Sequence, residues 1–179
     1  HSLDNTIKIL EKYKNNDRIM IFTNDKNKGC GYTKNKCAEL ASGEIAGFLD
    51  PDDTIEKEAI KTMVEEHKKR LDCSLIYSSL NICDENLNLI RKSSFVKKID
   101  EDKSYLDYKS GSISQFATFK LDFFNKTTGI NKFFLRAVDQ DLYLKLEEVG
   151  NTYFIPKHLY NYRNHSKSIS LYENEKKAF

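Results

Sequence analysis

Several features that mark whole classes of protein are scarce or missing in this sequence. Two prolines and seven glycines in 179 residues leave little room for a long disordered linker. No apolar run approaches the roughly 20 residues of a membrane-spanning helix, and no signal peptide opens the sequence. The formal net charge of +2 argues against a dedicated nucleic-acid surface, which needs a strong basic field. The composition therefore predicts one soluble globular domain over residues 1–179, large enough to bury a core.

The four cysteines show none of the spacings of a metal site or a disulfide framework. Cys30, Cys37, Cys73 and Cys83 form no C-x-x-C pair, so a structural zinc site is not expected. A disulfide-stabilised secreted domain would have denser cysteines in a shorter chain. We therefore expect four free thiols and a reducing, cytoplasmic compartment.

Three common motifs of nucleotide binding and catalysis are also missing. Gly29-Cys30-Gly31 does not begin a dinucleotide fingerprint, because Lys34 occupies the position of the third glycine. The sequence has no G-K-[ST] phosphate loop and no G-x-S-x-G elbow. The chemistry must therefore be sought elsewhere in the chain.

Apolar residues alternate between helical and strand spacing, which indicates an α/β domain. Helices are expected over residues 6–13, 32–41, 54–71 and 138–149. Strands are expected over residues 18–22, 45–49, 74–81, 87–91, 153–155 and 159–163. Because helix and strand alternate in the first half, we predict a mixed, mainly parallel sheet flanked by helices.

The clearest chemical signal is Phe48-Leu49-Asp50-Pro51-Asp52-Asp53, directly after an apolar strand. Ligands usually bind at the carboxyl ends of strands in open α/β sheets, and three carboxylates there favour a bound cation. Mg²⁺ or Mn²⁺ would suit these oxygen ligands and could bridge to phosphate. The same residues also fit an ordinary helix start, with Asp50 as the cap and Pro51 in the first turn. These interpretations are compatible, and the residues alone leave both open.

Short motifs follow one another in a fixed order around this cluster. Asn27-Lys28-Gly29 precedes Lys34-Asn35, then Ala41-Ser42-Gly43-Glu44, then the acidic segment at residues 48–53. This order resembles the N-x-G, R-N, A-x-G-E and F-L-D-x-D-D pattern of family 2 glycosyltransferases with the GT-A fold. Any one of these motifs alone would be weak, but their common order is specific.

The resemblance extends into the second half of the chain. Gly129-Ile130-Asn131 is similar to the G-x-F-D-E loop on the acceptor side of the family. Residues 138–146 resemble its E-D-x-D-L-x-L-R-L helix, and residues 162–170 resemble its closing Y-R-x-H-x-x-S-x-S segment. The resemblance therefore covers most of the chain and implies a GT-A-like fold.

The sequence also departs from the family pattern. Lys34 stands where arginine is usual, and Val138 replaces the first acid of E-D. Residues 1–6 resemble only the tail of the D-D-G-S-x-D-x-T loop. We therefore expect a partial catalytic core that lacks the first nucleotide-binding strands and does not turn over nucleotide sugars by itself. Residues 18–22 should then form an exposed sheet edge through which the chain could self-associate.

The resemblance implies a metal-dependent, inverting sugar transfer. The donor would be a nucleoside-diphosphate sugar, most simply a UDP-sugar, and the acceptor a hydroxyl of a sugar or lipid-linked sugar. Mn²⁺ or Mg²⁺ held by Asp52, with Asp50 and Asp53 nearby, would stabilise the diphosphate leaving group.

The remaining roles also follow from the resemblance. Lys34, Asp50, Arg163 and His165 are implied on the donor side, with Lys34 adding positive charge near the diphosphate. Asp139 is implied as the general base that takes the proton of the acceptor hydroxyl. Without the resemblance, an acid at a helix start such as Asp139 is equally an ordinary dipole partner.

Two other classes of function stay open at this point. A different divalent-metal phosphoester enzyme could use the same aspartates, and a truncated domain could serve binding alone. The resemblance favours bacterial cell-surface polysaccharide or glycoconjugate synthesis, in the cytoplasm or peripherally at the inner face of the membrane. No nucleic-acid partner is expected.

Overall fold

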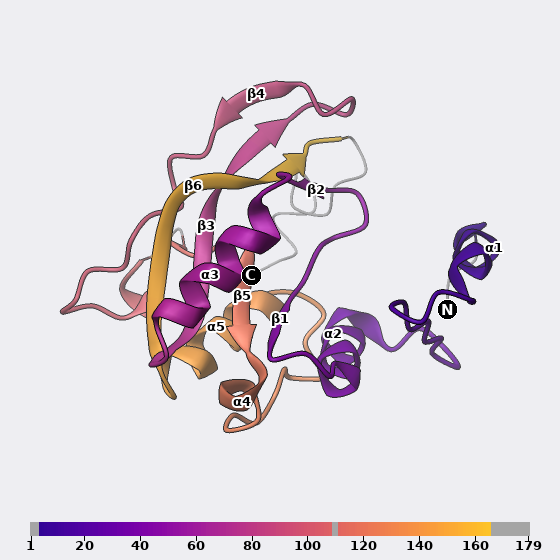
Figure 1. Cartoon of the computed structure of the whole chain (residues 1–179), viewed down its shortest axis with the longest axis horizontal. Helices are drawn as coiled ribbons and strands as arrows, with labels where there is room; N and C mark the ends of the chain where they lie inside the picture. Colours follow the sequence, from indigo (N-terminus) through magenta and orange to yellow (C-terminus); the bar gives the residue numbers. More distant parts are fainter. Residues whose placement is uncertain (1–3, 109–110, 166–179) are drawn as a thin grey trace.

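The computed structural model describes residues 4–108 and 111–165, in which helices surround one mixed sheet (Figure 1). The strands follow the order β1-β5-β3-β6-β2, and β4 pairs with the far part of β3. Their bounds are β1 Ile45–Gly47, β2 Thr54–Ile55, β3 Cys73–Cys83, β4 Leu89–Lys92, β5 Ala117–Lys120 and β6 Asn151–Arg163. The helices are α1 Thr6–Leu10, η1 Glu11–Tyr13, α2 Gly29–Leu40, α3 Ala59–Lys69, η2 Tyr105–Asp107, α4 Leu121–Phe124 and α5 Val138–Glu147.

The mixed sheet flanked by helices is confirmed, but most neighbouring strands are antiparallel. β1 and β3 both run antiparallel to β5, and β6 runs parallel to β3. β1, β3 and β6 therefore point the same way, as helical crossovers require. The sheet is therefore mixed as predicted but not mainly parallel. The reason is that β5, from later in the chain, lies between β1 and β3 and runs opposite to both.

Helices α3 and α5 cover opposite faces of the sheet. Neighbouring residues of a strand point to opposite faces, and on β5 Thr118 meets His67 of α3 while Phe119 lines a pocket with Leu142 of α5. Helical spacing explains both contacts: α3 buries Ala59, Met63 and His67, and α5 buries Val138, Leu142 and Leu146.

The last strand is longer than the sequence predicts. β6 is continuous over the ranges 153–155 and 159–163, which the sequence analysis treated as two strands. Its pairing slips between them, because Ile155 lies opposite Ser78 and His158 opposite Ser79. Pro156 lies in this interval and has no N–H to donate, so the ladder shifts register instead of ending.

Residues 18–22 form no strand, so the predicted sheet edge is absent from the part of the chain that the structure describes. Figure 1 shows the segment between α1 and α2 lying away from the sheet. Its apolar side chains are exposed, with Met20 at 71% and Phe22 at 50%. An apolar run needs a neighbouring strand to complete its backbone hydrogen bonds, and none lies beside it here.

Gly31 of α2 is expected to be essential for stability. Its N–H donates to the carbonyl oxygen of Phe134 at 3.1 Å. A Cβ here would overlap the carbonyl oxygen of Asn131 and lie 2.7 Å from that of Phe134. Because both neighbours are backbone, Gly31→Ala should lower the free energy of unfolding by about 3 kcal/mol in urea denaturation. Gly43→Ala is the control, since its Cβ would lie no closer than 3.4 Å to another atom; equal losses in both variants would contradict the prediction.

Candidate active site

The acidic segment forms a turn between β1 and β2. The N–H of Asp53 donates to the carbonyl oxygen of Asp50 at 3.1 Å, and β2 begins at Thr54. Helix α3 begins only at Ala59 and is preceded by Glu58 as its cap residue. The helix-start interpretation of the aspartates is therefore wrong, as is the predicted helix start at residue 54. The N–H of Glu56 instead donates to Leu159 of β6, which draws this stretch into the sheet.

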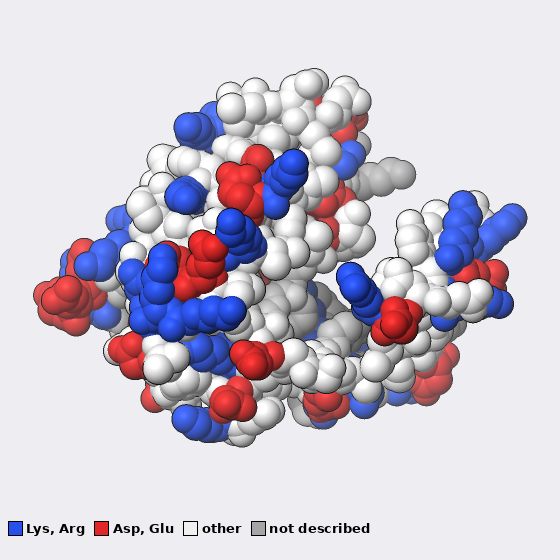
Figure 2. Space-filling model, viewed as in Figure 1, with Lys and Arg blue, Asp and Glu red and all other residues white. Residues whose placement is uncertain are grey.

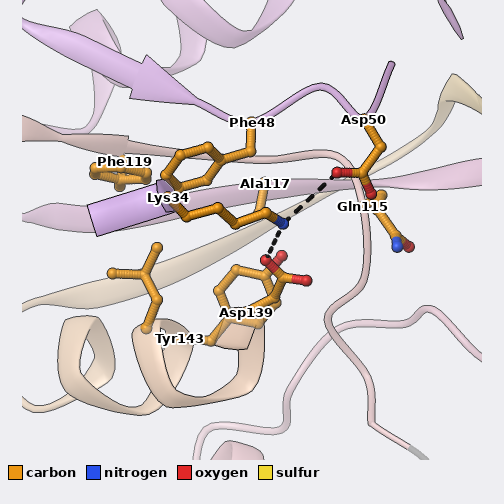
Figure 3. A pocket seen from close by; sticks show the side chains of 9 residues that line it. Lys34, Phe48, Asp50, Gln115, Ala117, Phe119, Asp139 and Tyr143 are labelled. Carbon is orange, nitrogen blue, oxygen red and sulfur yellow. Dashed lines mark hydrogen bonds and ion pairs between the residues drawn. The ribbon is translucent and has the colours of Figure 1, made fainter. Parts of the chain in front are cut away.

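Lys34 of α2 brings two of the predicted carboxylates together (Figure 3). Its Nζ lies 2.6 Å from Oδ1 of Asp139 and 3.7 Å from Oδ1 of Asp50. The lysine side chain is only 15% exposed, and Nζ lies 5.2 Å from the ring centre of Phe48. Asp139 lies in the first turn of α5, so elements far apart in the sequence converge on one ammonium group.

The charges in this cluster influence one another. Burial alone would lower the pKa of Lys34, but Asp139 and Asp50 outweigh it and raise this pKa. Burial raises the pKa of Asp50, the carboxylates of Asp139 and Asp52 add to the effect, and Lys34 opposes it. Lys34 therefore stays an ammonium, and the neighbouring acids carry more negative charge than it neutralises. Such a site favours an additional cation.

Asp52 lies on the side of the turn that faces the end of β6. Its Oδ2 lies 3.0 Å from Nε2 of His165, and its carbonyl oxygen accepts a hydrogen bond from Nε of Arg163 at 2.6 Å. The Asp52 side chain is 46% exposed. Of the closing segment predicted at residues 162–170, residues 166–170 lie outside the described part of the chain.

Asp53 does not converge with Asp50 and Asp52. It is 8% exposed, and both of its carboxylate oxygens are occupied. Oδ2 accepts from the hydroxyl of Tyr160 at 2.7 Å, and Oδ1 accepts from the backbone N–H of Arg163 at 2.7 Å. Burial raises the pKa of Asp53, and these two hydrogen bonds oppose the rise. Its carboxylate therefore holds the turn against β6.

Several residues that line the site were not predicted as site residues from the sequence. Gln115, Phe119, Leu142 and Tyr143 line the pocket that contains Lys34, Asp50 and Asp139. Leu142 and Tyr143 lie in the helix motif at residues 138–146 but look like ordinary core positions, and Gln115 and Phe119 belong to no motif. Only the folded chain brings them together around one pocket.

The described residues fit a metal shared with a ligand better than a metal held by protein alone. No group of three or more His, Cys, Asp or Glu side chains within residues 4–108 and 111–165 is arranged to hold an ion. Asp52 and His165 provide one carboxylate and one imidazole that already face each other. Mg²⁺ and Mn²⁺ are commonly bound through one or two carboxylates together with substrate phosphates. The donor set therefore suits a cation completed by a diphosphate.

The mixed sheet flanked by helices agrees with the GT-A fold of glycosyltransferases. The chain belongs to glycosyl transferase family 2: residues 1–142 match the family described as Glycosyl transferase family 2. Over 172 residues it is 34% identical to a chondroitin synthase of Escherichia coli and 28% identical to a chondroitin synthase of Pasteurella multocida. Each match covers 95% of this chain, but only 24% and 17% of those proteins.

A solved structure shows the same fold. TarS 1–349 of S. aureus in complex with UDP-GlcNAc superimposes with a TM-score of 0.74 and 22% identity, over 96% of this chain and 50% of that one.

The four cysteines are all free, as expected. None of the helices within residues 4–108 and 111–165 is long and apolar enough to cross a membrane.

Proposed function

We propose that this domain transfers a sugar from a UDP-sugar to a hydroxyl acceptor with inversion at the anomeric carbon. The observation that carries the proposal is the position of the Lys34 ammonium, 2.6 Å from Asp139 and 3.7 Å from Asp50. This ammonium lies between Asp139, a carboxylate suited to act as a base, and the Asp50 turn, which is suited to the leaving diphosphate. One pocket thus contains the charges that the two ends of a transfer reaction need.

Asp139 is the proposed general base. Lys34 contacts Oδ1 of Asp139, and the Asp139 side chain is 36% exposed. The carboxylate is therefore held in place while it stays accessible. The acceptor hydroxyl gives its proton to this carboxylate as its oxygen attacks the anomeric carbon. Attack from the face opposite the leaving diphosphate inverts the configuration of that carbon.

Asp52 and His165 are the proposed holders of Mn²⁺ or Mg²⁺. When bound, the ion acts as a Lewis acid on the diphosphate. Lys34 adds a fixed positive charge on the pocket side, and Arg163 positions the turn through the carbonyl oxygen of Asp52. Asp50 orients Lys34. Asp53 is not among the proposed metal ligands, because both of its carboxylate oxygens already accept hydrogen bonds from β6.

The comparisons suggest the substrate class. The relatives are named as chondroitin synthases, and the TarS structure is named with UDP-GlcNAc. We infer a UDP-sugar donor and a growing surface polysaccharide or lipid-linked sugar as the acceptor. The reaction would take place in the cytoplasm, at the inner face of the membrane where such acceptors are anchored.

Calorimetric titration of UDP into the protein that contains this domain tests the donor site. UDP should bind more tightly with Mn²⁺ than without it, and Asp52→Asn should remove most of this enhancement because a metal ligand is lost. Asp122→Asn is the matched control at an exposed position of α4. Equal UDP affinity with and without Mn²⁺ would exclude the proposed metal role.

The same preparation discriminates the alternative phosphoester enzyme. An enzyme of that class should hydrolyse bis(p-nitrophenyl) phosphate with Mn²⁺ alone and show no preference for UDP. A glycosyltransferase should bind UDP and leave this diester intact. A non-catalytic domain should neither bind UDP nor hydrolyse the diester.

A further inference from the structure

Gln115 provides an uncharged amide at the mouth of the candidate active site. It lines the same pocket as Lys34, Asp50 and Asp139. Figure 3 shows its side chain beside Asp50, with the terminal amide directed away from the backbone into the space next to Asp139. The nearby ionic groups suit a diphosphate and a proton transfer, whereas a neutral amide suits an uncharged partner.

The backbone around Gln115 is held by three separate contacts. The carbonyl oxygen of Phe116 accepts from the N–H of Ser78 on β3 at 3.2 Å. The Phe116 ring stacks on that of Tyr160 on β6, with centres 6.1 Å apart. On the other side, the hydroxyl of Tyr143 on α5 donates to the carbonyl oxygen of Ser114 at 3.5 Å. The amide is thus carried by a backbone fixed from β3, β6 and α5.

The orientation of the amide is set by its neighbour. The hydroxyl of Ser114 donates to Oε1 of Gln115 at 2.6 Å. This contact directs the other end of the amide, Nε2 with its two N–H donors, toward the pocket. Within residues 4–108 and 111–165, Nε2 donates to no protein acceptor. The side chain is half-buried, so a ligand in the pocket would be the natural acceptor.

We infer that Gln115 is a specificity-determining residue that recognises the donor sugar by hydrogen bonding to a ring hydroxyl or acetamido oxygen. This inference rests on the proposed function. A sugar ring that joins the diphosphate near Asp52 to the attack position near Asp139 must pass the mouth where Gln115 lies. A positioned amide donor discriminates between sugars because the wrong epimer leaves its N–H groups unpaired.

Calorimetry with Mn²⁺ tests the inference, using UDP, UDP-glucose, UDP-galactose, UDP-GlcNAc and UDP-GalNAc as probes. Gln115→Ala should weaken the preferred UDP-sugar about five-fold and reduce its advantage over the other sugars, while the Kd of UDP stays unchanged. Gln115→Asn tests reach, because its shorter amide keeps the chemistry but should not restore the preference. Gln140→Ala is the matched control, the same substitution at an exposed position of α5. Circular dichroism melting confirms that each variant is folded.

The outcomes separate this inference from the proposed function. If the unaltered protein binds neither UDP nor any UDP-sugar, the proposed function fails and the inference fails with it. If it binds UDP-sugars and Gln115→Ala leaves all five affinities unchanged, only the inference is overturned. An equal loss for UDP and for every UDP-sugar also overturns it, because Gln115 would then act on the nucleotide or the fold.

Discussion

Replacing Asp139 by asparagine is expected to lower kcat for sugar transfer about 1,000-fold, because a positioned general base contributes roughly 10²–10⁴-fold. Asparagine keeps the size of the side chain and can still face Lys34 through its amide oxygen. It cannot accept the proton of the acceptor hydroxyl. UDP binding should therefore persist while transfer from a radiolabelled UDP-sugar is lost, in the protein that contains this domain.

Asp122→Asn provides the matched control for this experiment. Asp122 is exposed in the first turn of α4 and should leave both binding and transfer unchanged. Asp141→Asn gives a second comparison, because Asp141 accepts from the N–H of Asn131 and pairs with Lys145 at 2.8 Å, a structural role. It should lower the melting temperature and leave the chemistry intact. If Asp139→Asn keeps more than a tenth of the rate, another residue is the base.

The second large effect concerns acid stability and His67. This histidine is 1% exposed on α3, its Nε2 lies 3.0 Å from Oγ1 of Thr118, and its Nδ1 is buried without a hydrogen-bond partner. Burial lowers the pKa of His67 to about 4; the backbone of Thr118 partly opposes the shift, and Lys120 adds to it. The folded protein therefore holds a neutral imidazole at neutral pH.

The sign of the pH dependence follows from this lowered pKa. As the pH falls below about 6.5, His67 becomes protonated in the unfolded chain. In the folded chain it stays neutral until about pH 4. The contribution of His67 is present at pH 7 and is lost across that window. With 1.36 kcal/mol per pKa unit, the free energy of unfolding should fall by about 3 kcal/mol from this residue.

Urea denaturation at several pH values between 7 and 4 measures this loss. His67→Gln should flatten the dependence of the unfolding free energy on pH, because glutamine does not titrate. His158→Gln is the control: burial and Lys92 also lower the pKa of His158, but this side chain is less buried and the effect should be smaller. A His67→Gln protein as acid-sensitive as the original would show that the acid effect arises from other groups.

The sequence by itself determined the features that depend on neighbours along the chain. The sequence predicted a helix over residues 138–149, and the structure has α5 there, with Asp139 in its first turn. The apolar run before residue 48 placed the acidic segment after a strand, where the structure has it. The order of the family motifs correctly indicated the GT-A fold and family 2.

The tertiary structure alone decided which of these features meet. Lys34 and Asp139 are 105 residues apart in the sequence, and they touch because the folded sheet brings α2 and the start of α5 together. The same folding turns Asp53 away to Tyr160 and leaves residues 18–22 without a strand partner. Periodicity records only which side of an element is apolar. Strand order and the hydrogen-bond partners of a carboxylate depend on residues distant in the sequence, so only the assembled sheet could reveal them.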